Sequence, residues 1–92
     1  MEVVVKPSFE KDIRKCPLYI QQDTKEVIEI LKAVENLQSS NLDYQKCQGR
    51  RGENYYRIRV GDWRIGVELK HPSLIIITIL TRGQVYKRFP PQ

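Results

Sequence analysis

The sequence predicts a small α+β domain, in which two helices pack on one face of a four-stranded, mainly antiparallel sheet. Residues 2–6 and 74–81 are apolar runs rich in β-branched side chains, which favour strands. Residues 55–69 alternate apolar and polar side chains around a Gly-Asp pair, which is typical of a β-hairpin. Apolar side chains at helical spacing in residues 27–37 indicate a core-facing helix. The predicted order is βααβββ, and two helices in succession pack on one face of such a sheet.

The first half of the chain is predicted to form one strand and two helices. Pro7 ends the strand of residues 2–6, because proline has no N–H to donate to a sheet. We expect Ser8 to cap a first helix, which ends before Pro17. The second helix begins between residues 18 and 24. Its core-facing stripe is made of apolar residues three or four positions apart: Val27, Ile30, Leu31, Val34 and Leu37.

The second half is predicted to form a loop and three strands. Residues 39–52 are polar and contain two glycines, which predicts a loop. The hairpin follows, and its turn opens at Gly61, where we expect a positive φ. Residues 74–81 show no alternation, which predicts a central strand covered on both faces and paired with the strand of residues 2–6. A basic and aromatic tail, residues 84–89, ends the ordered chain.

Length and charge indicate one domain, residues 1–92, with a polyanionic partner. Ninety-two residues can bury one modest core, and the net charge is +5. Residues 1–45 hold 6 basic and 8 acidic side chains, whereas residues 46–92 hold 10 and 3. Basic residues gathered in one half favour nucleic acid as the partner. The alternative is a basic surface that serves solubility alone.

Several classes of site are excluded by the residues present. Cys16 and Cys47 are the only cysteines, so neither a disulfide framework nor a cysteine metal site can be built. His71 is the only histidine, which excludes a pair of histidines as acid and base. The sequence contains no glycine-rich phosphate loop, no signal peptide and no apolar run long enough to span a bilayer. We therefore expect a cytoplasmic protein with no metal, no small-molecule cofactor and no membrane partner.

The hairpin carries a candidate anion-binding face. By strand alternation Arg57 and Arg59 share this face with Arg64, and the other face is apolar. Guanidinium groups match phosphate oxygens and stabilise charge that develops on a phosphate during cleavage. They are poor proton acceptors, but Tyr86 can accept a proton if nearby positive charges favour its phenolate form. Tyrosines among basic residues also stack on unpaired RNA bases. These residues alone predict a basic α+β module that binds RNA.

The second half of the chain also resembles a known family. The residues that carry the resemblance are the hairpin YYRIRVGDWRIGVEL, the apolar strand after it and the tail TRGQVYKRFP. They are similar to the toxins of bacterial type II toxin–antitoxin modules, the RelE/ParE superfamily, on its RelE side. The resemblance covers essentially the whole chain. It implies a RelE-like fold and a ribosome-dependent mRNA endoribonuclease that inhibits translation. It further implies cleavage through the ribose 2′-hydroxyl without metal, and inhibition by a cognate antitoxin.

The resemblance also implies a set of site residues. The catalytic candidates are four arginines and one tyrosine: Arg57, Arg59, Arg64, Arg82 and Tyr86. We expect five further basic residues to contact RNA: Lys46, Arg50, Arg51, Lys87 and Arg88. This chain has Thr81 where many relatives have histidine, and arginine where RelE-type toxins often have lysine on the first hairpin strand, which leaves Tyr86 as the candidate proton acceptor. Two alternatives stay open: a ParE-like inhibitor of DNA gyrase, and a catalytically degenerate RNA-binding module.

Overall fold

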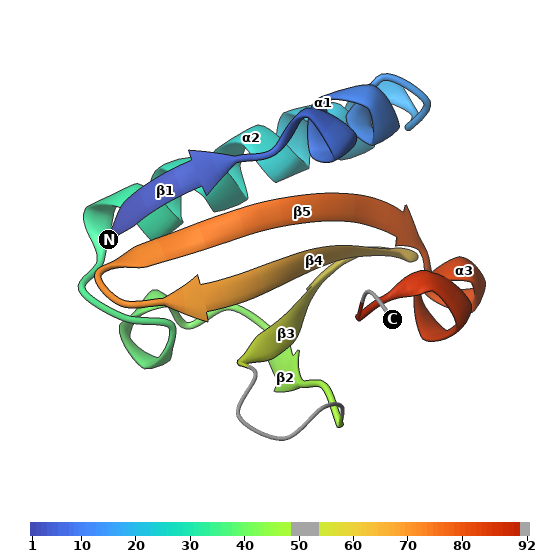
Figure 1. Ribbon diagram of the computed structural model, residues 1–92. Coiled ribbons are helices and arrows are strands. Elements are labelled where there is room, and N and C mark those ends of the chain that lie inside the picture. The colour runs from blue at the N-terminus through green and yellow to red at the C-terminus, as the bar shows by residue number, and fades with distance from the viewer. Residues whose placement is uncertain (49–53, 91–92) are drawn as a thin grey trace.

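A five-stranded sheet runs through the protein, with the strand order β1-β5-β4-β3-β2 (Figure 1). The computed structural model describes residues 1–48 and 54–90. Over these residues the elements are β1 (Glu2–Val5), α1 (Pro7–Ile13), α2 (Leu18–Ala33), a 3₁₀ turn (Gln38–Ser40), β2 (Tyr44–Lys46), β3 (Tyr55–Val60), β4 (Trp63–Lys70), β5 (Ser73–Thr81) and α3 (Arg82–Arg88). β1 pairs with β5 in parallel, and the other neighbours are antiparallel. The predicted α+β class and its mainly antiparallel sheet are confirmed.

The prediction of four strands is wrong by one. The fifth strand is β2, which lies inside the predicted loop of residues 39–52 and pairs its three residues with β3. A strand this short carries no readable alternation, so it depends on the hydrogen bonds that β3 offers. Beyond its end, Cys47 still donates its backbone N–H to the Tyr55 carbonyl at 2.8 Å.

The residues after β5 form a helix, α3, where the sequence predicted only a basic and aromatic tail. Thr81 ends β5 and caps α3, because its Oγ1 accepts from the Gln84 N–H at 3.3 Å. The Gln84 side chain in turn accepts from the Thr81 N–H at 3.3 Å. This reciprocal pair is a capping box, and it turns the chain directly from strand into helix.

The helices α1 and α2 begin close to the predicted places, but the predicted core-facing stripe extends through Val34 and Leu37, beyond the observed end of α2. The expectation that Ser8 caps α1 is wrong: the helix starts at Pro7 with Lys6 as its N-cap, and the Ser8 hydroxyl donates to the Ile77 carbonyl on β5. Proline at the first helical position suits a helix start, because its missing N–H has no partner there in any case. α2 begins directly after Pro17 and ends at Ala33.

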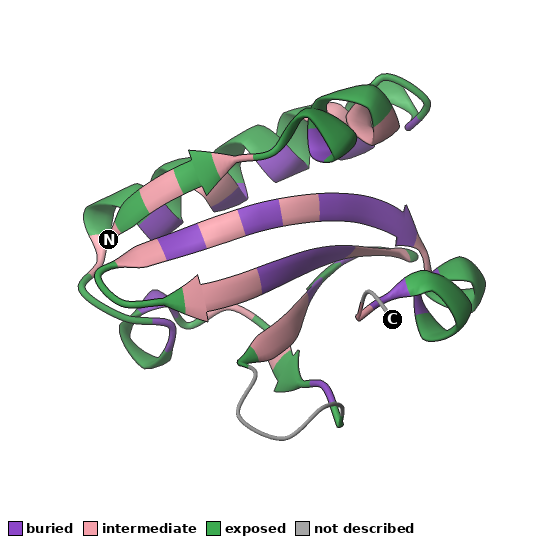
Figure 2. Ribbon diagram, in the orientation of Figure 1, coloured by how far each residue is buried: buried purple, intermediate pink, exposed green. Residues whose placement is uncertain are grey.

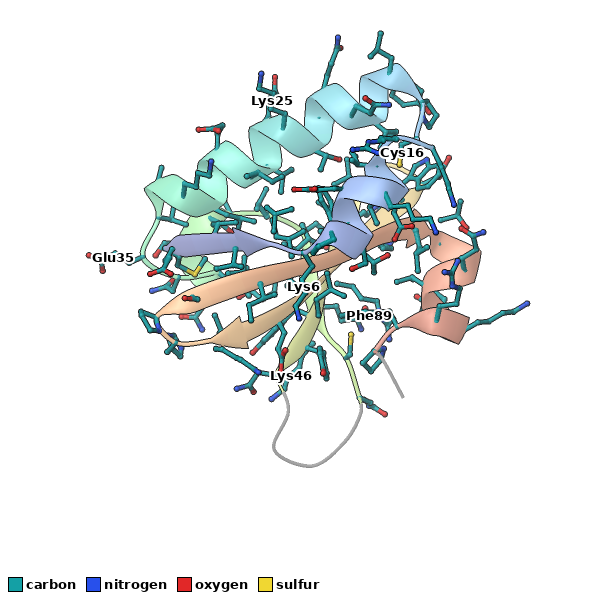
Figure 3. The ribbon with its side chains drawn as sticks, turned by 45° about the horizontal axis from the view of Figure 1, so that its top comes forward. Lys6, Cys16, Lys25, Glu35, Lys46 and Phe89 are labelled. Atoms are coloured by element: carbon teal, nitrogen blue, oxygen red, sulfur yellow. The ribbon has the colours of Figure 1, made fainter. Side chains whose placement is uncertain are left out.

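The helices α1 and α2 cover one face of the sheet, as predicted. The buried residues of both helices lie on the side nearest the strands (Figure 2). The largest core cluster joins Ile20 and Leu31 of α2 to Ile58, Ile65 and Val67 of the hairpin. On the outer side, Lys25 of α2 and Glu35 just after it point away from the sheet (Figure 3). None of the helices in the described ranges is long and apolar enough to cross a membrane.

The other face of the sheet carries α3. Cys47, Leu80, Val85 and Phe89 form a second, smaller cluster there, and Tyr55 and Ile77 pack against it. Residues of β5 thus contribute to both clusters, and β5 pairs with β1 and β4. The prediction of a central strand covered on both faces is confirmed. Since α3 covers only part of this face, it leaves the arginines of the hairpin beside it.

Candidate functional site

The arginines of the hairpin lie on one face, on the side of the sheet that carries α3. In the β3–β4 register Arg59 is opposite Arg64, and Arg57 is opposite Gly66. Directly paired residues point to the same face, so the predicted basic face is confirmed. The turn between the strands opens at Gly61 with φ +57°, as expected.

β2 extends this face across a third strand. Gln45 pairs with Arg57, and the Asp43 carbonyl accepts from the Arg59 N–H at 2.8 Å. Asp43 and Gln45 therefore stand beside the arginines. They were missed in the sequence because residues 39–52 read as a loop, and neither residue belongs to a motif.

A hollow of about 200 Å³ lies in this face. Its lining comes from β2, β3, β4 and α3: Asp43, Tyr44, Gln45, Arg57, Arg59, Arg64 and Tyr86. Four of the five predicted catalytic residues therefore meet in one place. Their three guanidinium charges exceed the single carboxylate by two, so the hollow attracts anions.

Arg57 and Tyr86 are in direct contact. The Cζ of Arg57 lies 4.5 Å from the centre of the Tyr86 ring, which is a cation–π arrangement. The contact joins β3 to α3 and holds the tyrosine beside the basic face. Tyr86 is still 59% exposed, so a ligand in the hollow can reach it.

Arg64 and Arg59 are held in two different ways. Arg64 donates from Nη1 to the carbonyls of Gly61 and Trp63, each at 2.9 Å, so its guanidinium group is held at the hairpin turn. Arg59 Nη1 lies 3.8 Å from Asp43 Oδ2, and both side chains are more than half exposed. Ion pairs of this kind contribute little, about 0–1 kcal/mol, so a phosphate can displace Asp43 from Arg59.

Arg82, the fifth predicted catalytic residue, does not line the hollow. It begins α3, its side chain is exposed, and its N–H donates to the Asp62 carbonyl at 3.0 Å in the hairpin turn. Arg82 therefore lies next to the hairpin tip, and it is not among the described residues that line the hollow.

The predicted RNA-binding residues are spread over the surface. Lys46 pairs with Tyr56, whose ring packs on the core that α2 covers, so Lys46 points to the face opposite the arginines. Arg88 lines a separate depression of about 190 Å³ with Asp12 and Lys15. Lys87 is exposed on α3. The remaining two, Arg50 and Arg51, lie outside the described residues.

The chemistry of the described site is that of arginine, carboxylate and phenol. In the part of the chain that the structure describes, no three His, Cys, Asp or Glu side chains gather closely enough to hold a metal ion. Cys47 lies near Arg57, but burial raises the pKa of its thiol, and the positive charge of Arg57 only opposes this effect. The thiol therefore belongs to the core cluster rather than to the reactive groups of the hollow.

Comparison with known proteins identifies the family. Residues 3–86 match the family of the ParE toxin of the type II toxin–antitoxin system parDE. The chain belongs to the RelE/ParE superfamily. It is 37% identical to Toxin RelE3 of Methanocaldococcus jannaschii over 90 residues, which are 98% of this chain and 100% of that toxin. The resemblance predicted from the hairpin and tail is confirmed.

Solved structures of the superfamily share the fold. The RelB-RelE antitoxin-toxin complex from Methanococcus jannaschii contains a chain 33% identical to this one, with a TM-score of 0.79 over 95% of this chain and 99% of that one. The archaeal RelE-RelB complex from Pyrococcus horikoshii OT3 matches at 22% identity and a TM-score of 0.73, over 90% and 96% of the two chains. The matched family bears the ParE name and these relatives bear the RelE name. The choice between an RNA target and DNA gyrase therefore depends on the site.

Proposed function

We propose that this RelE/ParE-superfamily toxin is a ribosome-dependent mRNA endoribonuclease that acts in the cytoplasm and inhibits translation. The observation that carries the proposal is the hollow itself, in which Arg57 stacks on Tyr86 beside Arg59 and Arg64. Three fixed positive charges and one phenol fit a phosphodiester that is both bound and cleaved. A surface that only bound a protein would not need these groups to converge.

The reaction that fits these groups is attack of a ribose 2′-hydroxyl on its adjacent phosphate. A bond forms between the 2′ oxygen and phosphorus, and the bond from phosphorus to the 5′ oxygen of the next nucleotide breaks. Negative charge builds up on the phosphate in the transition state, where Arg57, Arg59 and Arg64 stabilise it. One proton must leave the 2′ oxygen and another must reach the 5′ oxygen, and we assign one of these transfers to Tyr86. Since guanidinium groups supply the positive charge, we propose cleavage without a metal ion.

The proposed inhibitor is a cognate antitoxin. The solved relatives from Methanococcus jannaschii and Pyrococcus horikoshii are both complexes of RelE with RelB, which supports a protein partner of this kind. Because residues 46–92 carry 10 basic and 3 acidic side chains, the antitoxin segment that covers the hollow should be acidic.

A ParE-like inhibitor of DNA gyrase is the second candidate, since the matched family carries that name. Expression of the toxin alone in a bacterial host separates the two functions. We expect growth arrest with rapid loss of mRNA, and new RNA ends carrying a 5′-hydroxyl and a 2′,3′-cyclic phosphate. DNA supercoiling should stay unchanged during this early phase. Gyrase–DNA cleavage complexes alongside intact transcripts would establish the gyrase target instead, and binding to ribosomes with no RNA cleavage would establish the degenerate RNA-binding module.

A further inference from the structure

We propose that Asp43 is the proton acceptor of the cleavage reaction and that Tyr86 is its proton donor, an assignment that rests on the proposed nuclease function. Asp43 stands immediately before β2, beside Arg59 and on the basic face. Among the described residues it contributes the only carboxylate to the lining of the hollow. No part of the RelE-type pattern in the hairpin and tail includes this position.

The side chains around the hollow differ in their ability to accept a proton. The three arginines stay charged throughout the physiological range and accept none. At neutral pH a phenol carries its proton and a carboxylate has lost its own, so the phenol suits donation and the carboxylate suits acceptance. An acid and a base at one phosphate are what attack by the 2′-hydroxyl and departure of the 5′ oxygen require. Asp43 and Tyr86 line the same hollow, Asp43 before β2 and Tyr86 on α3.

The carboxylate of Asp43 weakens the binding of an anionic ligand, so its presence in the hollow needs a functional explanation. A negative charge in a hollow that binds a polyanion repels the ligand and weakens binding. In the free protein Arg59 offsets this charge, with Nη1 3.8 Å from the carboxylate oxygen. The pair is exposed and weak, so a substrate phosphate can take over Arg59 and leave the carboxylate free to accept a proton.

The step balances with these two groups alone. The 2′ O–H bond breaks and its proton moves to the carboxylate of Asp43. The 2′ oxygen bonds to phosphorus as the bond to the 5′ oxygen breaks, and Tyr86 gives its proton to that oxygen. The products are a 2′,3′-cyclic phosphate and a 5′-hydroxyl. Proton exchange with water then returns Asp43 and Tyr86 to their starting forms.

The test is single-turnover cleavage of mRNA on programmed ribosomes, measured together with ribosome affinity. In Asp43→Asn we expect cleavage to fall by about 10²-fold or more, the range for loss of a general base. Ribosome affinity should stay the same or rise, because a repulsive charge is gone. The Asp43→Glu variant keeps the carboxylate and should retain more activity than Asp43→Asn.

Two controls separate a chemical role from a structural one. Glu29→Gln removes the same charge from the exposed Glu29–Lys32 pair on α2 and should leave cleavage unchanged. If Asp43 acted only by holding Arg59, Asp43→Asn would have no further effect in an Arg59→Ala background; we expect a further loss there. Cleavage by Asp43→Asn at the parental rate, or an equal loss of affinity and rate, would overturn the assignment and leave the nuclease function standing. A parent protein that does not cut would overturn both.

Discussion

The ring of Phe89 occupies the space where a side chain at Gly66 would lie. A Cβ built on Gly66 would come within 2.8 Å of the Phe89 ring, closer than such atoms approach in proteins. Phe89 follows α3 and is buried with Val85 of that helix. The glycine on β4 therefore allows α3 to dock on the basic face, and this docking places Tyr86 beside Arg57.

We predict that Gly66→Ala loosens α3 and lowers activity. The added methyl group meets the body of the Phe89 ring rather than a flexible chain end, so the ring has to move. We expect a loss of about 1–3 kcal/mol in the free energy of unfolding, as for other overpacked sites. Cleavage should fall as well, because Tyr86 moves with the helix. Urea denaturation and single-turnover cleavage on programmed ribosomes measure the two effects.

Gly83→Ala is the matched control, since it adds the same methyl group within α3. A Cβ at Gly83 meets nothing within 4 Å, and alanine favours a helix over glycine by up to about 1 kcal/mol. This variant should be as stable as the parent or slightly more so, with its activity kept. Equal losses in both variants would show that the contact with Phe89 is not the cause.

The hairpin could be predicted from the sequence because its signals are local. Alternation with a period of two fixes which side chains share a face, and Gly61 marks the turn. The convergence of Arg57, Arg59 and Arg64 follows from those two facts. A pairing shifted by one residue would have turned either Arg57 and Arg59 of β3 or Arg64 of β4 toward the core, so the hydrophobic pattern also determines the register.

The sequence did not predict β2, the position of Asp43 or the helix α3. The first two depend on contacts with residues distant in the sequence, and the third depends on a capping signal that was overlooked. β2 is three polar and aromatic residues at a sheet edge, and only β3 makes it a strand. Asp43 enters the hollow through that pairing, so no local pattern could reveal it. The start of α3 was readable, since Thr81 and Gln84 have capping-box spacing, but Gly83 in the first turn indicated a break.

We predict that the three hairpin arginines contribute to ribosome binding in a salt-dependent manner. Each change of Arg57, Arg59 or Arg64 to alanine should weaken binding and slow cleavage. It should also reduce the slope of log affinity against log salt by about one if the arginine contacts a phosphate. Arg57→Ala should slow cleavage most, because it also removes the contact that holds Tyr86.

Arg14→Ala provides the control for overall charge. Arg14 is exposed at the end of α1, on the face of the sheet opposite the hollow. The Arg14→Ala variant should keep a slope of log affinity against log salt, and a cleavage rate, close to those of the parent. A slope reduced equally by Arg14→Ala would mean that net charge, and not the hollow, governs binding.

We predict that the two buried thiols make the protein less stable at alkaline pH. Burial raises the pKa of the Cys16 thiol, and the negative charge of Asp12 raises it further. Burial also raises the pKa of the Cys47 thiol, although the positive charge of Arg57 opposes this effect. A thiol whose pKa is higher in the folded than in the unfolded state contributes stability that is fully present below its unfolded pKa. That contribution is lost as the pH rises through the folded pKa. The free energy of unfolding under reducing conditions should therefore fall above the ordinary thiol pKa.

A variant that combines Cys16→Ala and Cys47→Ala shows whether the thiols are responsible. Its stability will be lower at every pH, because both side chains are buried and alanine leaves space behind. Its decline between neutral and alkaline pH should nevertheless be smaller than that of the parent. An identical decline in both proteins would assign the pH dependence to tyrosine or lysine instead.

The last prediction separates binding from chemistry at Tyr86. Tyr86→Phe removes only the phenolic oxygen and keeps the ring on which Arg57 stacks. Ribosome affinity should therefore change little. Single-turnover cleavage should fall by about 10²–10⁴-fold, the range for loss of a general acid or base. Arg82→Ala is the control, because Arg82 is not among the described residues that line the hollow, and its loss should leave cleavage close to the parental rate. If Tyr86→Phe cuts at the parental rate, the tyrosine moves no proton in the reaction.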